Sequence, residues 1–429
     1  FLLAKMWHIF AVSSLSVSGS ARAMGRSPAL ADRRSIGSLH VPSLGAAGRS
    51  PALTDRSAIG SLDVPSLGIG TIAWLGKTDA DKARIAAVAA RARVRGLDFF
   101  DTAERYGATP LSLIPAALAG LGLPVDKSYL GGDCESNLAS WGRGAMVATK
   151  FTPIPTRRHA SDVVDAARSS RERLGVDSID LYQLHMPDVI QPLRAFGVVD
   201  LKDEIYWDGL AECYHLGLVK NVGVSNYGAS MLERAQEHLA RRGVPLASNQ
   251  IAFNLLCQRD GSLKALRKGE ELGVKTLAYY PLAMGLLTGK LVPSNLRRAV
   301  LERKISPQRA ADLCRYLEGG SGGTAGHVAP GGIRPLLAVL TDVAASRSKT
   351  PAQVALNWIL CKGALPIAGA SSVTQIEENV DALGWRLTAD EVCLLDVAAE
   401  ALPFNFKGCG FQTTDSKFVG YGFERWTLH

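Results

Sequence analysis

Short apolar runs alternate with longer amphipathic stretches along the chain from Leu67 onward. The longer stretches carry apolar residues at helical spacing, and the short runs have the length and composition of buried strands. Eight strands are predicted, at residues 69–74, 97–101, 145–150, 179–184, 219–224, 246–251, 274–279 and 365–369. Strands that alternate with helices form a parallel sheet, and eight such units close into a barrel. We therefore predict one α/β domain, a (β/α)8 TIM barrel, over residues 67–401.

Four chemically capable side chains follow three successive predicted strands. Asp101 ends one apolar run and Tyr106 comes five residues later, while Lys150 and His185 end the next two runs. The carboxyl ends of barrel strands meet at one face, where such folds place their active sites. A buried carboxylate requires a positive partner, so we expect Asp101 to pair with Lys150. Each residue alone has a structural explanation, as a turn, solvated or packing residue, but together the four predict an active site.

Seven sequence blocks resemble the aldo-keto reductase family, in that family's own order. They are LDFFDTAERYG, VATKF, IDLYQLHMPD, VGVSNY, SNQIAFNLL, AYYPLAMGLLTGK and IAGASSVTQIEEN, and the resemblance covers residues 67–395. The phrases GLVKNVGVSNY, PLASNQ and TPAQVALNW are also similar to the plastid-targeted branch of plants and algae. The resemblance implies NADPH-dependent reduction of aldehydes or ketones, with the cofactor extended across the barrel mouth. It also explains why no Gly-x-Gly-x-x-Gly follows any predicted strand.

The four strand-end residues suit this chemistry. A carbonyl reductase delivers a hydride to carbon and a proton to oxygen, and free tyrosine, with a pKa of roughly 10, is a poor proton relay near neutral pH. The ammonium of Lys150 can lower the pKa of Tyr106, and Asp101 can hold Lys150 in place. His185 can hydrogen-bond the substrate oxygen and orient it toward Tyr106. The resemblance assigns the same roles to these four positions.

The resemblance also implies the residues that contact the cofactor. It places the carboxamide against Ser225, Asn226 and Gln250, whose side chains are suited to hydrogen bonding, and the nicotinamide ring against Tyr279. The remaining predicted contacts are Leu282, Gly285, Leu287 and Lys290 near the pyrophosphate, Ser371, Gln375, Glu378 and Asn379 at the adenosine end, and Gly70, Thr71, Asp101 and Gly369.

The adenosine end has a simpler explanation as the start of a helix, with Ser372 as its cap and Glu378 on a solvated face. Many relatives bind the 2′-phosphate of NADP with Lys and Arg, where this chain has Ala370 and Gln375. Other branches use Ser and Gln there. NADP is therefore the favoured cofactor, and NAD is the alternative.

Charge and cysteine content exclude several other classes. The net charge is +8, and residues 1–66 contribute +4 of it through seven Lys/Arg and three Asp. The rest of the chain has no basic stripe with interleaved aromatics, which argues against nucleic-acid binding. The seven cysteines are scattered, without a CxxC pair, so we expect reduced thiols and no metal site. No apolar run in the body reaches the length of a membrane span.

Residues 1–66 are predicted to be a disordered targeting leader. An apolar stretch and an Ala-Arg-Ala sequence at 21–23 precede a region rich in Ser, Arg and Gly, which suits a plastid presequence. Translated upstream sequence, with a cytoplasmic protein, is the alternative. A direct repeat lies within this region: residues 25–45 recur as residues 48–68 with four differences. One copy is too short to fold alone, and the first copy is predicted to be disordered.

Two insertions and a tail complete the organisation. Residues 108–132 are a long loop, and residues 294–335 contain a glycine-rich run that predicts a mobile flap or linker. The aromatic tail, residues 402–429, is predicted to pack on the barrel, shape the substrate pocket, or contact a protein or lipid body. Two alternatives to an enzyme follow: a redox-sensing or scaffold subunit whose cofactor turns over slowly, and a structural protein of plastid lipid bodies or membranes.

Overall fold

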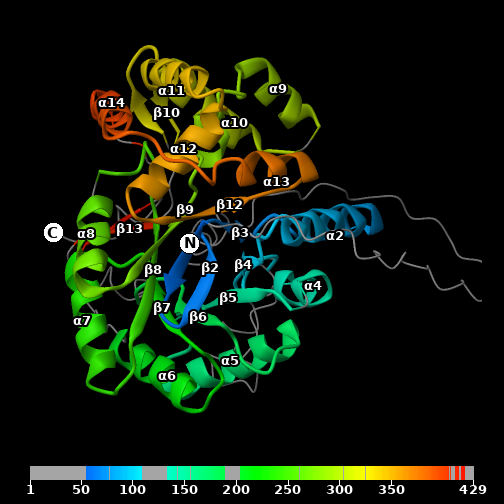
Figure 1. Ribbon diagram of the computed structural model, residues 1–429, viewed down its shortest axis with the longest axis vertical. Helices are drawn as coiled ribbons and strands as arrows, with labels where there is room; N and C mark the ends of the chain where they lie inside the picture. Colours follow the sequence, from blue (N-terminus) through cyan, green and yellow to red (C-terminus); the bar gives the residue numbers. More distant parts are fainter. Residues whose placement is uncertain are drawn as a thin grey trace, which may run out of the picture.

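Eight parallel strands close into a barrel, as the alternating pattern predicts (Figure 1). The computed structural model describes residues 55–76, 78–108, 133–142, 144–154, 156–188, 203–259, 261–302, 304–323, 325–404, 406, 411–414 and 417–420. In barrel order the strands are β12 (Leu365–Gly369), β3 (Gly68–Gly70), β4 (Phe99–Asp101), β5 (Met146–Phe151), β6 (Leu181–Leu184), β7 (Val222–Ser225), β8 (Leu246–Ala252) and β9 (Lys275–Tyr279).

Each barrel strand is followed by a helix on the outside of the sheet (Figure 1). Local signals set the ends of these helices. The hydroxyl of Thr78 accepts from the N–H of Asp81 at the start of the helix that begins at Asp79, and Gly175, with φ 65°, ends the helix that begins at Ala160. These helices are α2 (Asp79–Val94), α4 (Cys134–Trp141), α5 (Ala160–Leu174), α6 (Asp203–His215), α7 (Ala229–Ala240), α8 (Ser262–Leu272), α12 (Pro351–Cys361) and α13 (Val373–Val380).

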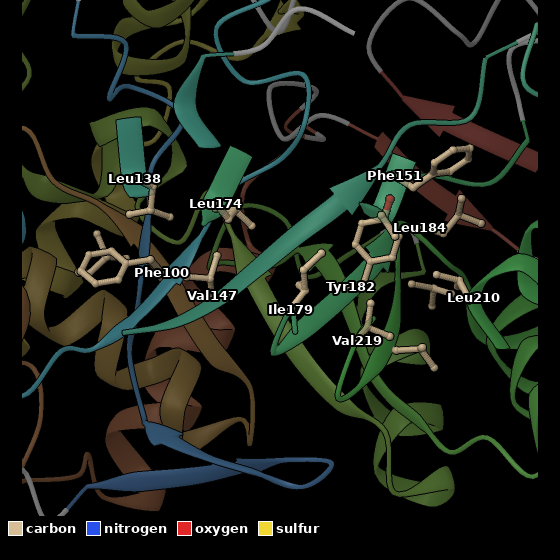
Figure 2. Close-up of a cluster of buried hydrophobic side chains, with 14 of the residues drawn as sticks. Phe100, Leu138, Val147, Phe151, Leu174, Ile179, Tyr182, Leu184, Leu210 and Val219 are labelled. Atoms are coloured by element: carbon tan, nitrogen blue, oxygen red, sulfur yellow. The ribbon is translucent and has the colours of Figure 1, made fainter. Parts of the chain in front are cut away.

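The main apolar core lies between the barrel and its helices. Figure 2 shows Val147 of β5 and Tyr182 of β6 among side chains from the surrounding helices, such as Leu138 of α4 and Leu210 of α6. All four are buried. Burying a large apolar side chain contributes about 1.5–3 kcal/mol, so this layer fixes the strands whose carboxyl ends carry the predicted site.

A hairpin closes the opposite end of the barrel, and it corrects the predicted leader boundary. Strands β1 (Arg56–Ile59) and β2 (Leu62–Pro65) pair antiparallel, although disorder was predicted through residue 66. The side chains of Ile59 and Val64 are fully buried against barrel residues that include Phe99. The hairpin thus belongs to the folded domain, because its alternate apolar side chains cover the interior of the barrel. The first repeat copy lies outside the described residues.

The segment predicted to be a mobile flap or linker, residues 294–335, instead forms helices and strands around a buried core, here called the subdomain. After η3 (Ala283–Thr288), it comprises α9 (Pro293–Leu301), α10 (Pro307–Glu318), β10 (Gly320–Gly322), β11 (Gly326–Val328) and α11 (Arg334–Ser346). Its core includes Ala325, Val328 and Ile333, all buried. The glycines of the run are needed for conformation: Gly319 and Gly332 have φ of 94° and 54° and pack against backbone, where a side chain would clash.

The start of the tail packs on this subdomain, after α14 (Ala389–Glu400). The rings of Phe404 and Phe406 lie 6.2 and 4.4 Å from that of Tyr316 in α10, and Arg259 donates to the backbone oxygen of Leu402. Farther along, β13 (Phe411–Thr414) and β14 (Lys417–Gly420) pair antiparallel. The insertion predicted at 108–132 lies outside the described residues from Thr109 on.

The cysteines only partly match the expected reduced thiols. Cys257 is disulfide-bonded, which scattered spacing in the sequence did not reveal. Five others in the described ranges are free, at positions 134, 213, 314, 361 and 393. Within the described part of the chain, no helix is both long and apolar enough to cross a bilayer.

Candidate active site

A buried ion pair joins the ends of β4 and β5. The ammonium of Lys150 lies 2.6 Å from Oδ2 of Asp101 and also donates to the backbone oxygen of Thr102 at 2.8 Å. The other carboxylate oxygen of Asp101 accepts from Nε2 of Gln250 at 2.8 Å. The side chains of Asp101 and Lys150 are 4 % and 1 % exposed. A carboxylate this deeply buried needs such donors, so the predicted pairing is confirmed.

The loop after β4 returns Tyr106 to this pair. Its phenol oxygen lies 3.3 Å from the ammonium of Lys150, which is also 4.9 Å from the centre of the ring. The N–H of Cys134 donates to the backbone oxygen of Tyr106 and connects the loop to α4. The phenol therefore shares one cation with the carboxylate of Asp101.

The imidazole of His185 faces the same place from the end of β6. Its ring is T-shaped to that of Tyr106, with 5.8 Å between centroids. The backbone of His185 is held on both sides, since its N–H donates to Phe151 and its oxygen accepts from Nδ2 of Asn226 at 2.9 Å. Three successive strand ends thus bring the four predicted residues together.

Burial governs protonation in this site. It is the largest cause that raises the pKa of Tyr106 well above its usual value, followed by the charge of Asp101. Lys150 was expected to lower this pKa, whereas burial, the largest cause, shifts it in the opposite direction. Burial also lowers the pKa of Lys150, against the opposing charge of Asp101. The pKa of His185 is far below 6.5, through burial and then the charges of Lys150 and Arg105. Tyr106 rests as a phenol and His185 as a neutral imidazole.

The residues predicted at the carboxamide lie at the neighbouring strand ends. The hydroxyl of Ser225 donates to the backbone oxygen of Gln250 at 2.7 Å, and Oδ1 of Asn226 accepts from the hydroxyl of Tyr279 at 2.7 Å. Asn226 holds a left-handed conformation with φ 66°. On the other side, Thr71 follows Gly70 and donates its hydroxyl to the backbone of Asp101 at 3.0 Å. These amide and hydroxyl groups suit a polar ring substituent beside Asp101.

The predicted pyrophosphate and adenosine residues face each other between η3 and α13. Leu282 and Gly285 lie at the start of η3, with Gly285 at φ 93°, and Leu287 is buried beneath them. Lys290 pairs with both carboxylate oxygens of Glu378 at 2.7 Å.

The α13 end combines helix capping with free polar groups. Two residues after Gly369, the N–H of Ser371 donates to the side chain of Gln375. The hydroxyl of Ser372 caps the helix, as predicted if this segment is simply a helix start. The buried Nδ2 of Asn379 has no hydrogen-bond partner among the described residues. A buried amide donor without a partner is unusual in a folded protein, so Nδ2 of Asn379 remains available to a ligand.

Glu104 and Thr152 were missed from the sequence. Oε1 of Glu104 accepts from the N–H of Thr152 and from Nη1 of Arg157, both at 2.6 Å, and all three residues are fully buried. Oγ1 of Thr152 lies 3.3 Å from Nδ1 of His185. The only signal in the sequence is an acid within the motif that carries Tyr106. Across the described ranges no cluster of His, Cys, Asp or Glu could hold a metal ion.

Comparison with known proteins agrees with this geometry. Residues 66–400 match the model of the aldo/keto reductase family. The chloroplastic pyridoxal reductase of Arabidopsis thaliana is 36% identical over 321 residues, which are 74% of this chain and 77% of that protein. Aldo-keto reductase str7 of Strobilurus tenacellus is 31% identical over 64% of this chain and 76% of its own.

Solved structures share the fold at low sequence identity. A thermostable aldo-keto reductase bound to epalrestat has a TM-score of 0.54 at 21% identity, over 80% of this chain and 99% of its own. A Bombyx mori aldo-keto reductase in complex with NADP has a TM-score of 0.53 at 20% identity, over 80% and 92%. With the family match spanning the whole barrel and the strand-end residues gathered at one face, the chain belongs to the aldo/keto reductase family.

Proposed function

We propose that the protein is an NADPH-dependent oxidoreductase that reduces aldehydes or ketones to alcohols. The observation that carries the proposal is the shared contact of Lys150, 2.6 Å from Asp101 and 3.3 Å from the phenol of Tyr106, with His185 alongside. A buried carboxylate–ammonium–phenol chain is suited to the movement of a proton. Neither alternative, a slow redox sensor or a lipid-body structural protein, requires such a chain.

One residue of the site binds the substrate, and the other three transfer the proton. A bound nicotinamide supplies the hydride. His185 donates a hydrogen bond to the substrate carbonyl oxygen and holds it beside Tyr106. Tyr106 donates its phenolic proton to that oxygen as negative charge develops on it. Lys150 then stabilises the phenolate, and Asp101 keeps the ammonium 2.6 Å away and charged.

The residues present fit NADP(H) by the chemistry of their donors. Ser225, Asn226 and Gln250 would hold the carboxamide, and Tyr279 would stack on the ring. Lys290 would meet the pyrophosphate. The orphaned Nδ2 of Asn379 offers a donor to the adenosine.

The test is consumption of NADPH by the purified full chain with a panel of small aldehydes. Pyridoxal leads the panel, because a pyridoxal reductase is 36% identical to this chain over 74% of its length. We expect turnover that Tyr106→Phe reduces by roughly a thousandfold or more while NADPH still binds, since only a transition-state interaction is removed. Tight NADPH binding without turnover of any aldehyde would instead support the redox sensor, and no binding would support the structural role.

We also propose a plastid location. The support is a leader with the composition of a presequence, together with the chloroplastic location named for the pyridoxal reductase. The check is a fluorescent fusion to the complete N-terminal region, expressed in a plastid-containing cell. Cytoplasmic fluorescence contradicts this location and leaves the enzymatic proposal unchanged.

A further inference from the structure

The hydroxyl of Thr152 lies where it can determine which ring nitrogen of His185 carries the hydrogen. Its hydroxyl is 3.3 Å from Nδ1 of the imidazole, and the residue is fully buried. Its backbone N–H is fixed separately, by Oε1 of Glu104 at 2.6 Å. The hydroxyl therefore meets one ring nitrogen from a backbone position that is itself hydrogen-bonded.

This contact matters because the imidazole of His185 is neutral and can therefore exist as either of two tautomers. Lys150 from β5 and Arg105 from the loop after β4 act on the ring through their charges, while Tyr106 and Thr152 contact it directly. Two of them are cations, and together with burial they keep the imidazole neutral. A neutral imidazole carries a single N–H, on either Nδ1 or Nε2. Only one of these two tautomers can donate to a substrate oxygen.

The position of the ring decides which tautomer is useful. Nδ1 faces Thr152, so the nitrogen left to meet a substrate is Nε2. A carbonyl oxygen is an acceptor, and Nε2 must therefore carry the hydrogen. Nδ1 is then an acceptor, and the threonine hydroxyl is the donor that satisfies it.

We propose that Thr152 is a positioning residue that donates to Nδ1 of His185 and so holds its imidazole in the Nε2–H tautomer. The inference rests on the proposed carbonyl reduction and adds a residue to its machinery. Glu104 supports the arrangement through the backbone of Thr152, and thereby links the loop of Tyr106 to the end of β5, where the hydroxyl of Thr152 meets His185.

The first measurement is independent of activity. In the full chain with ¹⁵N-labelled histidine, the imidazole signals of His185 are identified by their loss in His185→Asn. We expect an unprotonated Nδ1 and a protonated Nε2, and a mixture of tautomers in Thr152→Val. Thr152→Ser keeps the hydroxyl and should restore the single tautomer.

The second measurement is kinetic. Thr152→Val should lower kcat by roughly tenfold while KM for the aldehyde changes by less than about threefold, because an oriented hydrogen bond is lost mainly in the transition state. Thr152→Ser should recover most of kcat. The matched control is Thr156→Val in the same loop, whose hydroxyl is buried without a partner among the described residues. It should leave kcat unchanged.

The outcomes separate the inference from the proposed function. An unchanged tautomer in Thr152→Val, or equal kcat values for the Val and Ser variants, overturns the role of Thr152. If the Val variant does not fold, Thr152→Ala and Thr152→Ser give the same comparison, and the same results decide it. Full activity in Tyr106→Phe overturns the proposed reduction, and the tautomer of His185 remains measurable in that case.

Discussion

The ammonium of Lys290 lies 2.7 Å from both carboxylate oxygens of Glu378, so two residues predicted at different parts of the cofactor bind each other. Lys290 follows η3, and Glu378 belongs to α13. The lysine side chain is 64 % exposed and the glutamate 17 %, and a pair this open to water contributes about 0–1 kcal/mol to stability. Such a weak bond can yield to a phosphate, which offers Lys290 more negative charge at the same place.

Replacement of Lys290 by Met should therefore weaken cofactor binding far more than it weakens the fold. We expect the Kd of NADPH to rise about tenfold, equivalent to about 1.4 kcal/mol, with little change in melting temperature. Titration of NADPH by fluorescence measures the first and thermal unfolding the second. Lys304→Met, an exposed lysine paired with Glu302, is the control and should change neither quantity. Equal losses in both variants would contradict a phosphate contact by Lys290.

Arg84 gives a reason to expect preference for NADPH in a chain that lacks the usual cations. Its Nη1 donates to the backbone oxygen of Ser371 at 2.6 Å, so helix α2 places a guanidinium beside the adenosine end where Ala370 and Gln375 supply no charge. Arg84→Ala should raise KM for NADPH by roughly tenfold and leave KM for NADH nearly unchanged, because only NADPH carries the 2′-phosphate. Steady-state kinetics with both cofactors measure this. Lys82→Ala on the same helix is the control, and parallel changes for both cofactors would refute the assignment.

The sequence predicted the strand-end residues because their signals are local. Asp101, Lys150 and His185 each terminate an apolar run, and parallel strands bring their carboxyl ends together whatever the connecting loops do. The contacts of Thr152 and Arg84 depend on the path of a loop and on the packing of a helix against another strand's end. No periodicity encodes either, so neither residue could be selected from the chain alone.

The glycine content suggested a mobile linker for a related reason. The run that ends at Gly332 has the composition of a flexible linker, yet it forms turns that need positive φ. Composition cannot distinguish a glycine that allows many conformations from one required for a single conformation. Val328 within the run and Ile333 directly after it were the better signal, because a flexible linker does not bury apolar side chains.

The pH dependence of turnover should be flat across the neutral range. Burial and nearby cations lower the pKa of His185 well below 6.5, so the imidazole is neutral at neutral pH and stays neutral above it. Burial raises the pKa of Tyr106 above 10, so the phenol keeps its proton until strongly alkaline pH. We expect kcat for reduction to vary by less than about twofold between about pH 6 and 9. A limb near pH 7 that disappears in His185→Asn would show that the imidazolium is the active form.

Within the described residues, the differences between the two repeat copies avoid the buried positions of the hairpin, and this pattern sets the last prediction. Three of the four differences fall at Ser57, Ala58 and Asp63, which are exposed or half-buried, while Ile59 and Val64 are buried and identical in both copies. Ile59→Ala should destabilise the protein by about 2–5 kcal/mol, since it opens a cavity at the closed end of the barrel. Asp63→His, the residue found in the first copy, breaks only a surface pair with Arg56 and should cost less than about 1 kcal/mol. Urea unfolding of both variants tests this. Equal stability of Ile59→Ala and the unmodified chain would mean that the hairpin is not needed to close the barrel.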